Sequence, residues 1–216
     1  MVNIAVFGAT GNIGSRIIDE ALRRGHTVTA VVRDPAKFTA TAPGLTVSTG
    51  DVLDPAAVTA VAKGQDVVVS AVGGGDGPGH QATIEPAARA LVEGLRALVD
   101  QAPRLVTVGG AGSLRTPGGQ QVWDTPGLPE PLLQIMHAHG EALDYYRTVT
   151  DLDWTNISPA ALIQPGTRTG GYRTAGEDLI TDEAGNSTIS IEDYAVAVLD
   201  EIENPRHSRQ RFTVAY

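Results

Sequence analysis

The chain has 216 residues, of which 42% are hydrophobic and 19% are charged, and it contains no cysteine. These values favour one soluble domain with a large core, and they exclude a disulfide framework and thiolate chemistry. The net charge of −9 disfavours nucleic acid as a partner, and no run reaches the roughly 18 apolar residues of a membrane span. Because the first residues lack the features of a secretory leader, we expect a cytoplasmic protein.

Short β-branched runs alternate with longer segments of helical period. In chain order we predict a strand at 3–7, a helix at 12–24, strands at 27–32 and 45–49, a helix at 55–62, a strand at 66–71, a helix at 83–101, a strand at 104–108, a helix at 131–148, a strand at 153–158, a helix at 191–203 and a strand at 211–214. Such alternation predicts an α/β domain in which helices cover both faces of a mostly parallel sheet.

Three glycine-rich or polar segments follow the carboxyl ends of predicted strands, at residues 73–80, 113–130 and 164–188. Ligands of open α/β sheets bind at that edge. We therefore expect a single domain over residues 1–216 with its substrate loops gathered there.

Glycines recur at every third position between the first strand and the first helix. Gly8 permits a tight turn, Gly11 lets the backbone approach a diphosphate, and Gly14 lets the helix pack close to the strand. The helix then directs free N–H groups at the phosphates. This pattern predicts a doubly wound Rossmann-type domain that binds a dinucleotide, and the alternative is a tight turn without a ligand. The predicted contacts are Gly8, Thr10, Gly11, Asn12, Ile13 and Gly14.

The end of the second strand bears on the choice between NADP and NAD. Arg33 can grip the 2′-phosphate of NADP, whereas an acidic residue at this point usually holds the ribose of NAD. Asp34 stands next to Arg33 and is the alternative ribose ligand, or the partner of Arg33 in a simple ion pair. We expect NADPH, with NAD as the second choice.

The ends of the third and fourth strands complete the predicted cofactor site. Asp51 can accept a hydrogen bond from adenine while Val52 or Leu53 packs on the ring; alternatively, Asp51 only orders a turn. Small side chains at the end of the fourth strand would admit a ribose. These residues are Ala71, Val72 and Gly73.

These motifs together resemble the atypical branch of the short-chain dehydrogenase/reductase superfamily. The resemblance is greatest to the NAD(P)H-binding family that includes NADH-flavin reductases and biliverdin/flavin reductase-like proteins. The segments that carry it are 8–14, 31–35, 50–53, 70–73, 109–114, 152–155, 157–160 and 189–195, spread over nearly the whole chain. It implies a seven-stranded sheet, with Ser158 and Pro159 near the nicotinamide.

One feature of the mainstream superfamily is missing. Its members carry a Tyr-x-x-x-Lys pair on the helix after the fifth strand. Here Tyr145 and Tyr146 lie on that helix, but the two lysines of the chain, Lys37 and Lys63, both precede the fifth strand. We therefore do not expect alcohol–ketone chemistry or sugar epimerisation by the usual route.

A flavin-like or quinone-like acceptor suits a hydride donor without that pair, because protons can come from solvent. Ser113 is a candidate to bind the acceptor or else a backbone-capping serine. His139 is a candidate proton donor, although its place on an apolar stripe also fits a packed histidine, and His137 carries the same alternatives. Trp123 is a candidate to stack on a flavin, and His80 faces either the ligand or solvent. We predict no metal site.

Two functions remain open at this point. The first is an NAD(P)H-dependent reductase of a small-molecule acceptor, with a flavin as one such substrate. The second is a non-catalytic NADP(H)-binding redox sensor that acts through a protein partner, since missing catalytic residues suit a sensor equally well.

Overall fold

A sheet of eight strands forms the middle layer of the molecule, in the order β3-β2-β1-β4-β5-β6-β10-β8. The computed structural model describes residues 1–216 except for the side chain of Lys37. The main strands are β1 (Asn3–Phe7), β2 (Thr27–Val32), β3 (Leu45–Thr49), β4 (Val67–Ser70), β5 (Arg104–Val108), β6 (Trp154–Ser158), β8 (Arg173–Ala175) and β10 (Gln210–Ala215). The strand order reverses between β1 and β4, which is the switch point at which such sheets bind ligands.

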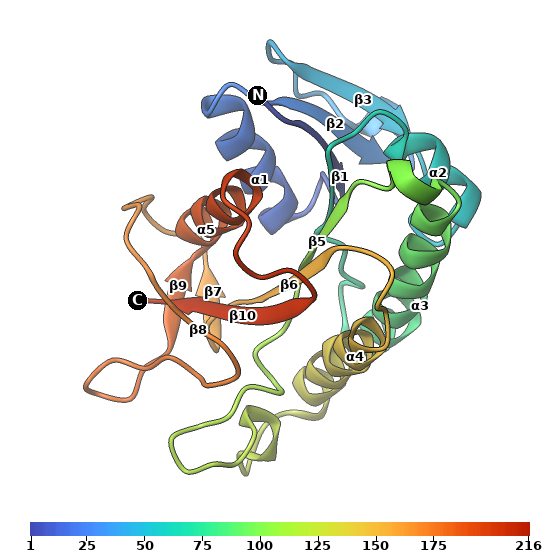
Figure 1. Ribbon diagram of the computed structural model, residues 1–216. Coiled ribbons are helices and arrows are strands. Elements are labelled where there is room, and N and C mark those ends of the chain that lie inside the picture. The colour runs from blue at the N-terminus through green and yellow to red at the C-terminus, as the bar shows by residue number, and fades with distance from the viewer.

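Helices cover both faces of this sheet (Figure 1). On one face lie α1 (Asn12–Arg23) and α5 (Ile191–Glu203), and on the other lie α2 (Pro55–Ala62), α3 (Gly77–Arg96) and α4 (Glu130–Arg147). Short 3₁₀ helices occur at Pro35–Lys37, Val99–Gln101 and Val122–Asp124. The prediction of a doubly wound α/β domain is therefore confirmed.

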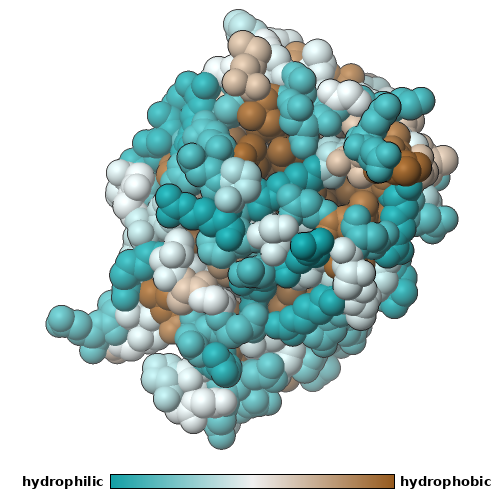
Figure 2. Space-filling view, viewed as in Figure 1, coloured by the Kyte–Doolittle hydropathy of each residue, from teal (hydrophilic) through white to brown (hydrophobic). Residues whose placement is uncertain are grey.

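Alternating side chains of the buried strands point to opposite faces of the sheet and pack into two hydrophobic cores. Ile4 and Val6 of β1 pack toward α1 and α5, whereas Ala5 and Phe7 pack toward α2, α3 and α4. The surface seen in Figure 2 is mostly hydrophilic with small, separate hydrophobic patches. Of the helices in the described part of the chain, none is long and apolar enough to cross a membrane.

The strand count differs from the predicted seven. Strand β8 adds to the edge of the sheet by pairing antiparallel with β10, so that Thr174 lies opposite Val214. A separate two-stranded sheet joins β7 (Leu162–Gln164) to β9 (Thr188–Ser190). These strands have three residues each and no alternating pattern, because distant pairing rather than local sequence defines them.

The third helix begins earlier than the predicted residue 83. The Asp76 side chain accepts a hydrogen bond from Gly79 N at 2.7 Å and caps a helix that starts at Gly77, with Pro78 in its first turn. The helix also ends before residue 101, at Arg96, and Val99 beyond it has a φ of 49°. Half of the predicted glycine loop 73–80 is therefore the first turn of α3.

A buried carboxylate on α1 ties the loop before β8 to the domain. Glu20 is 4% exposed and accepts hydrogen bonds from Arg24 Nε at 2.7 Å and from Arg168 Nε at 2.9 Å. Burial opposes ionisation of Glu20, but the hydrogen bonds from Arg168, Arg23 and Arg24 outweigh it and lower its pKa to about 2.

This network predicts a loss of stability in acid. Because the pKa of Glu20 is lower in the folded chain, its contribution is present above the ordinary carboxylate pKa of 4.5 and is lost as the pH falls toward about 2. Glu20→Gln should lower the free energy of unfolding by up to about 3 kcal/mol at pH near 7 and by much less near pH 3. Urea unfolding at both pH values measures this, and an equal difference at both would contradict it.

Candidate functional site

The turn after β1 lies against the end of β4 with no room for side chains. Gly8 has a φ of +82°, and a Cβ on it would stand 2.3 Å from the Ala71 carbonyl oxygen. A Cβ on Gly14 would stand 2.2 Å from the Gly8 carbonyl oxygen. Both atoms are backbone and cannot move aside, so these two glycines are needed for the close packing of turn, strand and helix.

Gly11 differs from Gly8 and Gly14 because a Cβ on it would make a tight contact and not an impossible one. The nearest atoms are the carbonyl oxygens of Gly8 at 3.3 Å and of Ala71 at 4.0 Å. Its backbone has ordinary extended angles, with a φ of −78° and a ψ of 165°. The packing of the turn therefore requires a glycine at position 11 less strictly than at positions 8 and 14.

Gly11 is also the N-cap of α1, and no side chain caps this helix end. Among the residues that the structure describes, no hydrogen bond occupies the N–H groups of Asn12, Ile13 and Gly14. The first turn carries no acidic residue. The N-terminal end of α1, here called its mouth, has free N–H groups and the positive end of the helix dipole. It is therefore suited to bind an anion such as a diphosphate.

Arg33 lies exposed at the end of β2. Its guanidinium makes no hydrogen bond or ion pair with any residue of the described chain. Asp34 accepts a hydrogen bond from Ala36 N at 3.1 Å and so caps the following 3₁₀ turn. The structure thus leaves Arg33 available for a phosphate at this edge.

The turn after β3 uses Asp51 and exposes Leu53. One carboxylate oxygen of Asp51 accepts a hydrogen bond from Leu53 N at 3.0 Å, as in a turn-ordering aspartate. Val52 is 9% exposed and packs into the core under α2 and α3, whereas Leu53 is 44% exposed. Of the two apolar candidates for an adenine wall, Leu53 is the one whose side chain is accessible.

The predicted nicotinamide end lies at the carboxyl ends of β4 and β6. Ala71 and Val72 are half-buried and Gly73 is exposed just after β4. Ser158 and Pro159 are both buried at the end of β6. The Ser158 hydroxyl has no hydrogen-bond partner among the described residues, which is unusual for a buried polar atom.

Ser113 and Trp123 are engaged in the long loop after β5. The Ser113 hydroxyl accepts a hydrogen bond from Arg211 Nη1 at 2.8 Å, and Arg211 also pairs with Glu177. The Trp123 ring packs over Gly140 of α4, with a centroid distance of 4.7 Å to the ring of His137. Ser113 thus anchors Arg211 rather than local backbone, and Trp123 fixes the loop to α4.

His139 reaches the end of β5 from α4. The Cβ atom of His139 lies 2.8 Å from the position that a Cβ on Gly110 would take. Burial, and secondarily the nearby charge of His80, lower the pKa of His139 to about 4, so its ring is neutral at neutral pH. His139 also lines a small cavity beneath the sheet edge, together with Ser70, Val72, Ile84, Thr107, Val108, Ala142, Tyr146 and Asn156.

His80 is the residue of this region that the sequence left unplaced. Its ring lies 5.8 Å from that of His139, centroid to centroid, and its Nε2 is 3.2 Å from a Cβ position on Gly73. The cap at Asp76 was the available signal, since a helix starting at Gly77 carries His80 back over the end of β4.

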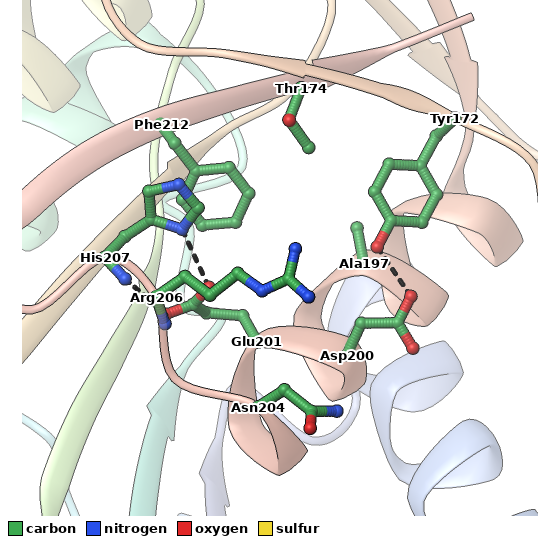
Figure 3. A pocket seen from close by; sticks show the side chains of 9 residues that line it. All are labelled: Tyr172, Thr174, Ala197, Asp200, Glu201, Asn204, Arg206, His207 and Phe212. Carbon is green, nitrogen blue, oxygen red and sulfur yellow. Dashed lines mark hydrogen bonds and ion pairs between the residues drawn. The ribbon is translucent and has the colours of Figure 1, made fainter.

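A larger cavity of about 250 Å³ lies elsewhere, between α5, β8 and β10 (Figure 3). His207 and Arg206 line it just before β10 begins, so it stands at the opposite edge of the sheet from the glycine turn. Its walls bond mainly to each other, as in the 2.8 Å contact between His207 Nδ1 and Glu201. In the described part of the chain, no three His, Cys, Asp or Glu residues are grouped to hold a metal ion.

Comparison with known proteins bears on this site. Residues 8–205 match a family described as NAD(P)H-binding. The chain is 38% identical to YwnB of Bacillus subtilis over 216 residues, which are 99% of this chain and 98% of YwnB. A candidate exported protein from Burkholderia pseudomallei is 48% identical, with a TM-score of 0.87 and 100% of both chains covered. A candidate NADH-flavin reductase from Streptococcus pneumoniae is 32% identical, with a TM-score of 0.85 and 100% and 99% covered.

Proposed function

The chain belongs to the NAD(P)H-binding family, and we propose that it is an NADPH-dependent reductase of flavin-like or quinone-like acceptors. One observation carries the proposal above all others. The free N–H groups at the start of α1 stand beside Gly11, which has no side chain to occupy the space in front of them. A dinucleotide diphosphate has the charge and the acceptor oxygens to fill that space.

The remaining cofactor contacts follow from the strand ends. Arg33 would hold the 2′-phosphate of NADP, while Asp51 and Leu53 would border the adenine. Ala71, Val72 and Gly73, with Ser158 and Pro159, would border the nicotinamide ribose. When bound there, a reduced nicotinamide supplies a hydride. NADPH and a chain without cysteine both suit the cytoplasm, where we place the activity.

The state of the two helix tyrosines supports an acceptor that needs no phenolic acid. Burial raises the pKa of Tyr146 well above its usual range, so this phenol stays neutral. Tyr145 lies under the Arg89 guanidinium, whose central carbon is 4.5 Å from the ring centroid. Neither tyrosine is followed by the lysine that alcohol–ketone chemistry requires, and the name of the streptococcal relative points to flavins.

Turnover assays test the proposed function directly. Pure protein is mixed with NADPH and with FMN, FAD or menadione, and the absorbance of the reduced nicotinamide is followed. We expect oxidation of NADPH well above the uncatalysed rate with at least one of these acceptors. Tight NADPH binding without turnover of any acceptor would contradict the proposed reductase and favour the non-catalytic redox sensor.

Arg33→Ala tests the choice of cofactor. Loss of a charge-assisted contact to the 2′-phosphate should weaken NADPH binding by about tenfold to a hundredfold, or about 1.4–2.7 kcal/mol. NADH lacks that phosphate, so its affinity should stay unchanged. Calorimetric titration measures both, with Arg206→Ala at the opposite edge of the sheet as the control. Equal losses for the two cofactors would show that Arg33 does not read the phosphate.

A further inference from the structure

We propose that His80, which lies beside His139 at the carboxyl ends of β4 and β5, is the residue that gives a proton to the acceptor. This inference rests on the proposed reductase function. It concerns the proton that accompanies a hydride when a carbonyl oxygen or ring nitrogen is reduced.

The hydrogen bond of His80 fixes which ring nitrogen exchanges protons. Its Nδ1 lies 2.8 Å from the backbone carbonyl oxygen of Asp76. A carbonyl oxygen only accepts, so Nδ1 carries a hydrogen and donates it. Nε2 has no hydrogen-bond partner among the described residues, and it lies over the exposed backbone of Gly73.

The setting of His139 keeps it from competing for that proton. Its lowered pKa leaves the ring neutral at neutral pH, so it does not repel a proton on His80 5.8 Å away. Tyr146, on the same helix, also stays neutral because burial raises its pKa. The Asp76 carboxylate is turned to the N–H of Gly79 as the helix cap. His139, Tyr146 and Asp76 therefore place no further positive charge beside His80.

The proton balance closes with solvent. The acceptor receives a hydride, and thus two electrons, from the reduced nicotinamide, and it receives a proton from Nε2 of protonated His80. The Nε2–H bond breaks, its electron pair stays on the nitrogen, and an O–H or N–H bond forms on the acceptor. His80 is half-buried, so water can return the proton.

His80→Asn separates proton delivery from folding. The asparagine amide can replace Nδ1–H as the donor to the Asp76 carbonyl, but it has no counterpart of Nε2. With menadione as the acceptor, we expect kcat to fall by about tenfold to a hundredfold and its decline at alkaline pH to disappear. Affinity for NADPH should not change. Arg206→Ala, beside the distant cavity at the start of β10, is the control and should behave as the wild type. An unaltered kcat and pH profile in His80→Asn would overturn the inference.

A second measurement does not depend on turnover. Imidazole NMR of the wild type is recorded during titration with NADP⁺. The signals of His80 and His139 should shift, while those of His26, bonded to Glu203 at the other edge, should not. If the wild type reduces no acceptor, the proposed function fails, and this titration still judges the placement of the pair. Unshifted His80 signals at saturation would refute it.

Discussion

Gly14→Ala should lower the free energy of unfolding by about 3 kcal/mol, although alanine favours helices. The new Cβ would meet the Gly8 carbonyl oxygen at 2.2 Å and the Gly8 carbonyl carbon at 2.8 Å. Since both are backbone atoms, α1 must move away from the turn. In a domain of this size the loss corresponds to a fall in Tm of about 6–12 °C.

Thermal unfolding followed by circular dichroism measures this loss. Gly176→Ala is the matched control, because no atom lies within 4 Å of its Cβ position and its φ is not in the left-handed region. We expect the control to unfold within a degree or two of the wild type. A Tm for Gly14→Ala equal to that of the control would mean that the turn and the helix are not in contact as described.

Gly11→Ala should have the opposite profile, with the fold kept and the cofactor lost. A Cβ on Gly11 would lie 3.3 Å from the Gly8 carbonyl oxygen, a tight contact that a small shift of the turn relieves, and its φ and ψ suit any residue. We therefore expect a stability loss of no more than about 1 kcal/mol. The added methyl group would stand in the space before the free N–H groups of α1. NADPH affinity should fall by about a hundredfold or more, which is about 2.7 kcal/mol.

Calorimetric titration with NADPH and thermal unfolding of the same sample distinguish the two effects. Ser15→Ala, one helical position beyond the mouth, serves as the control, since its hydroxyl only bonds back to the Asn12 carbonyl. Full NADPH affinity in Gly11→Ala would rule out a diphosphate at this mouth, whereas loss of both affinity and stability would mean that Gly11 is needed for packing.

The strands and the helix faces were predictable because local patterns determine them. Five apolar or β-branched runs became β1, β2, β3, β4 and β5 within a residue. Strands β1, β2, β4 and β5 are largely buried and so have to be apolar, whereas β3 is a mostly exposed edge strand that its β-branched residues indicate. Ser190 and the pattern after it located α5, and its hydroxyl does accept a hydrogen bond from Asp193 N. The early start of α3 was missed because glycines concealed the cap at Asp76.

The site was predictable only where the backbone itself makes it. Three glycines determine the turn, so the sequence located the turn and the start of α1 that no side chain caps. Side-chain partners depend on distant segments, as Ser113 shows by bonding Arg211, 98 residues later. In the same way, only the packed structure shows that Val52 faces the core, and that His80 and His139 come together.

The most direct test of the account is a crystal structure of the protein grown with NADPH. We predict diphosphate oxygens within hydrogen-bonding distance of the N–H groups of Asn12 and Ile13, in front of Gly11. A nucleotide bound elsewhere, for example in the cavity beside Tyr172 and Phe212, with the start of α1 left to solvent, would contradict it.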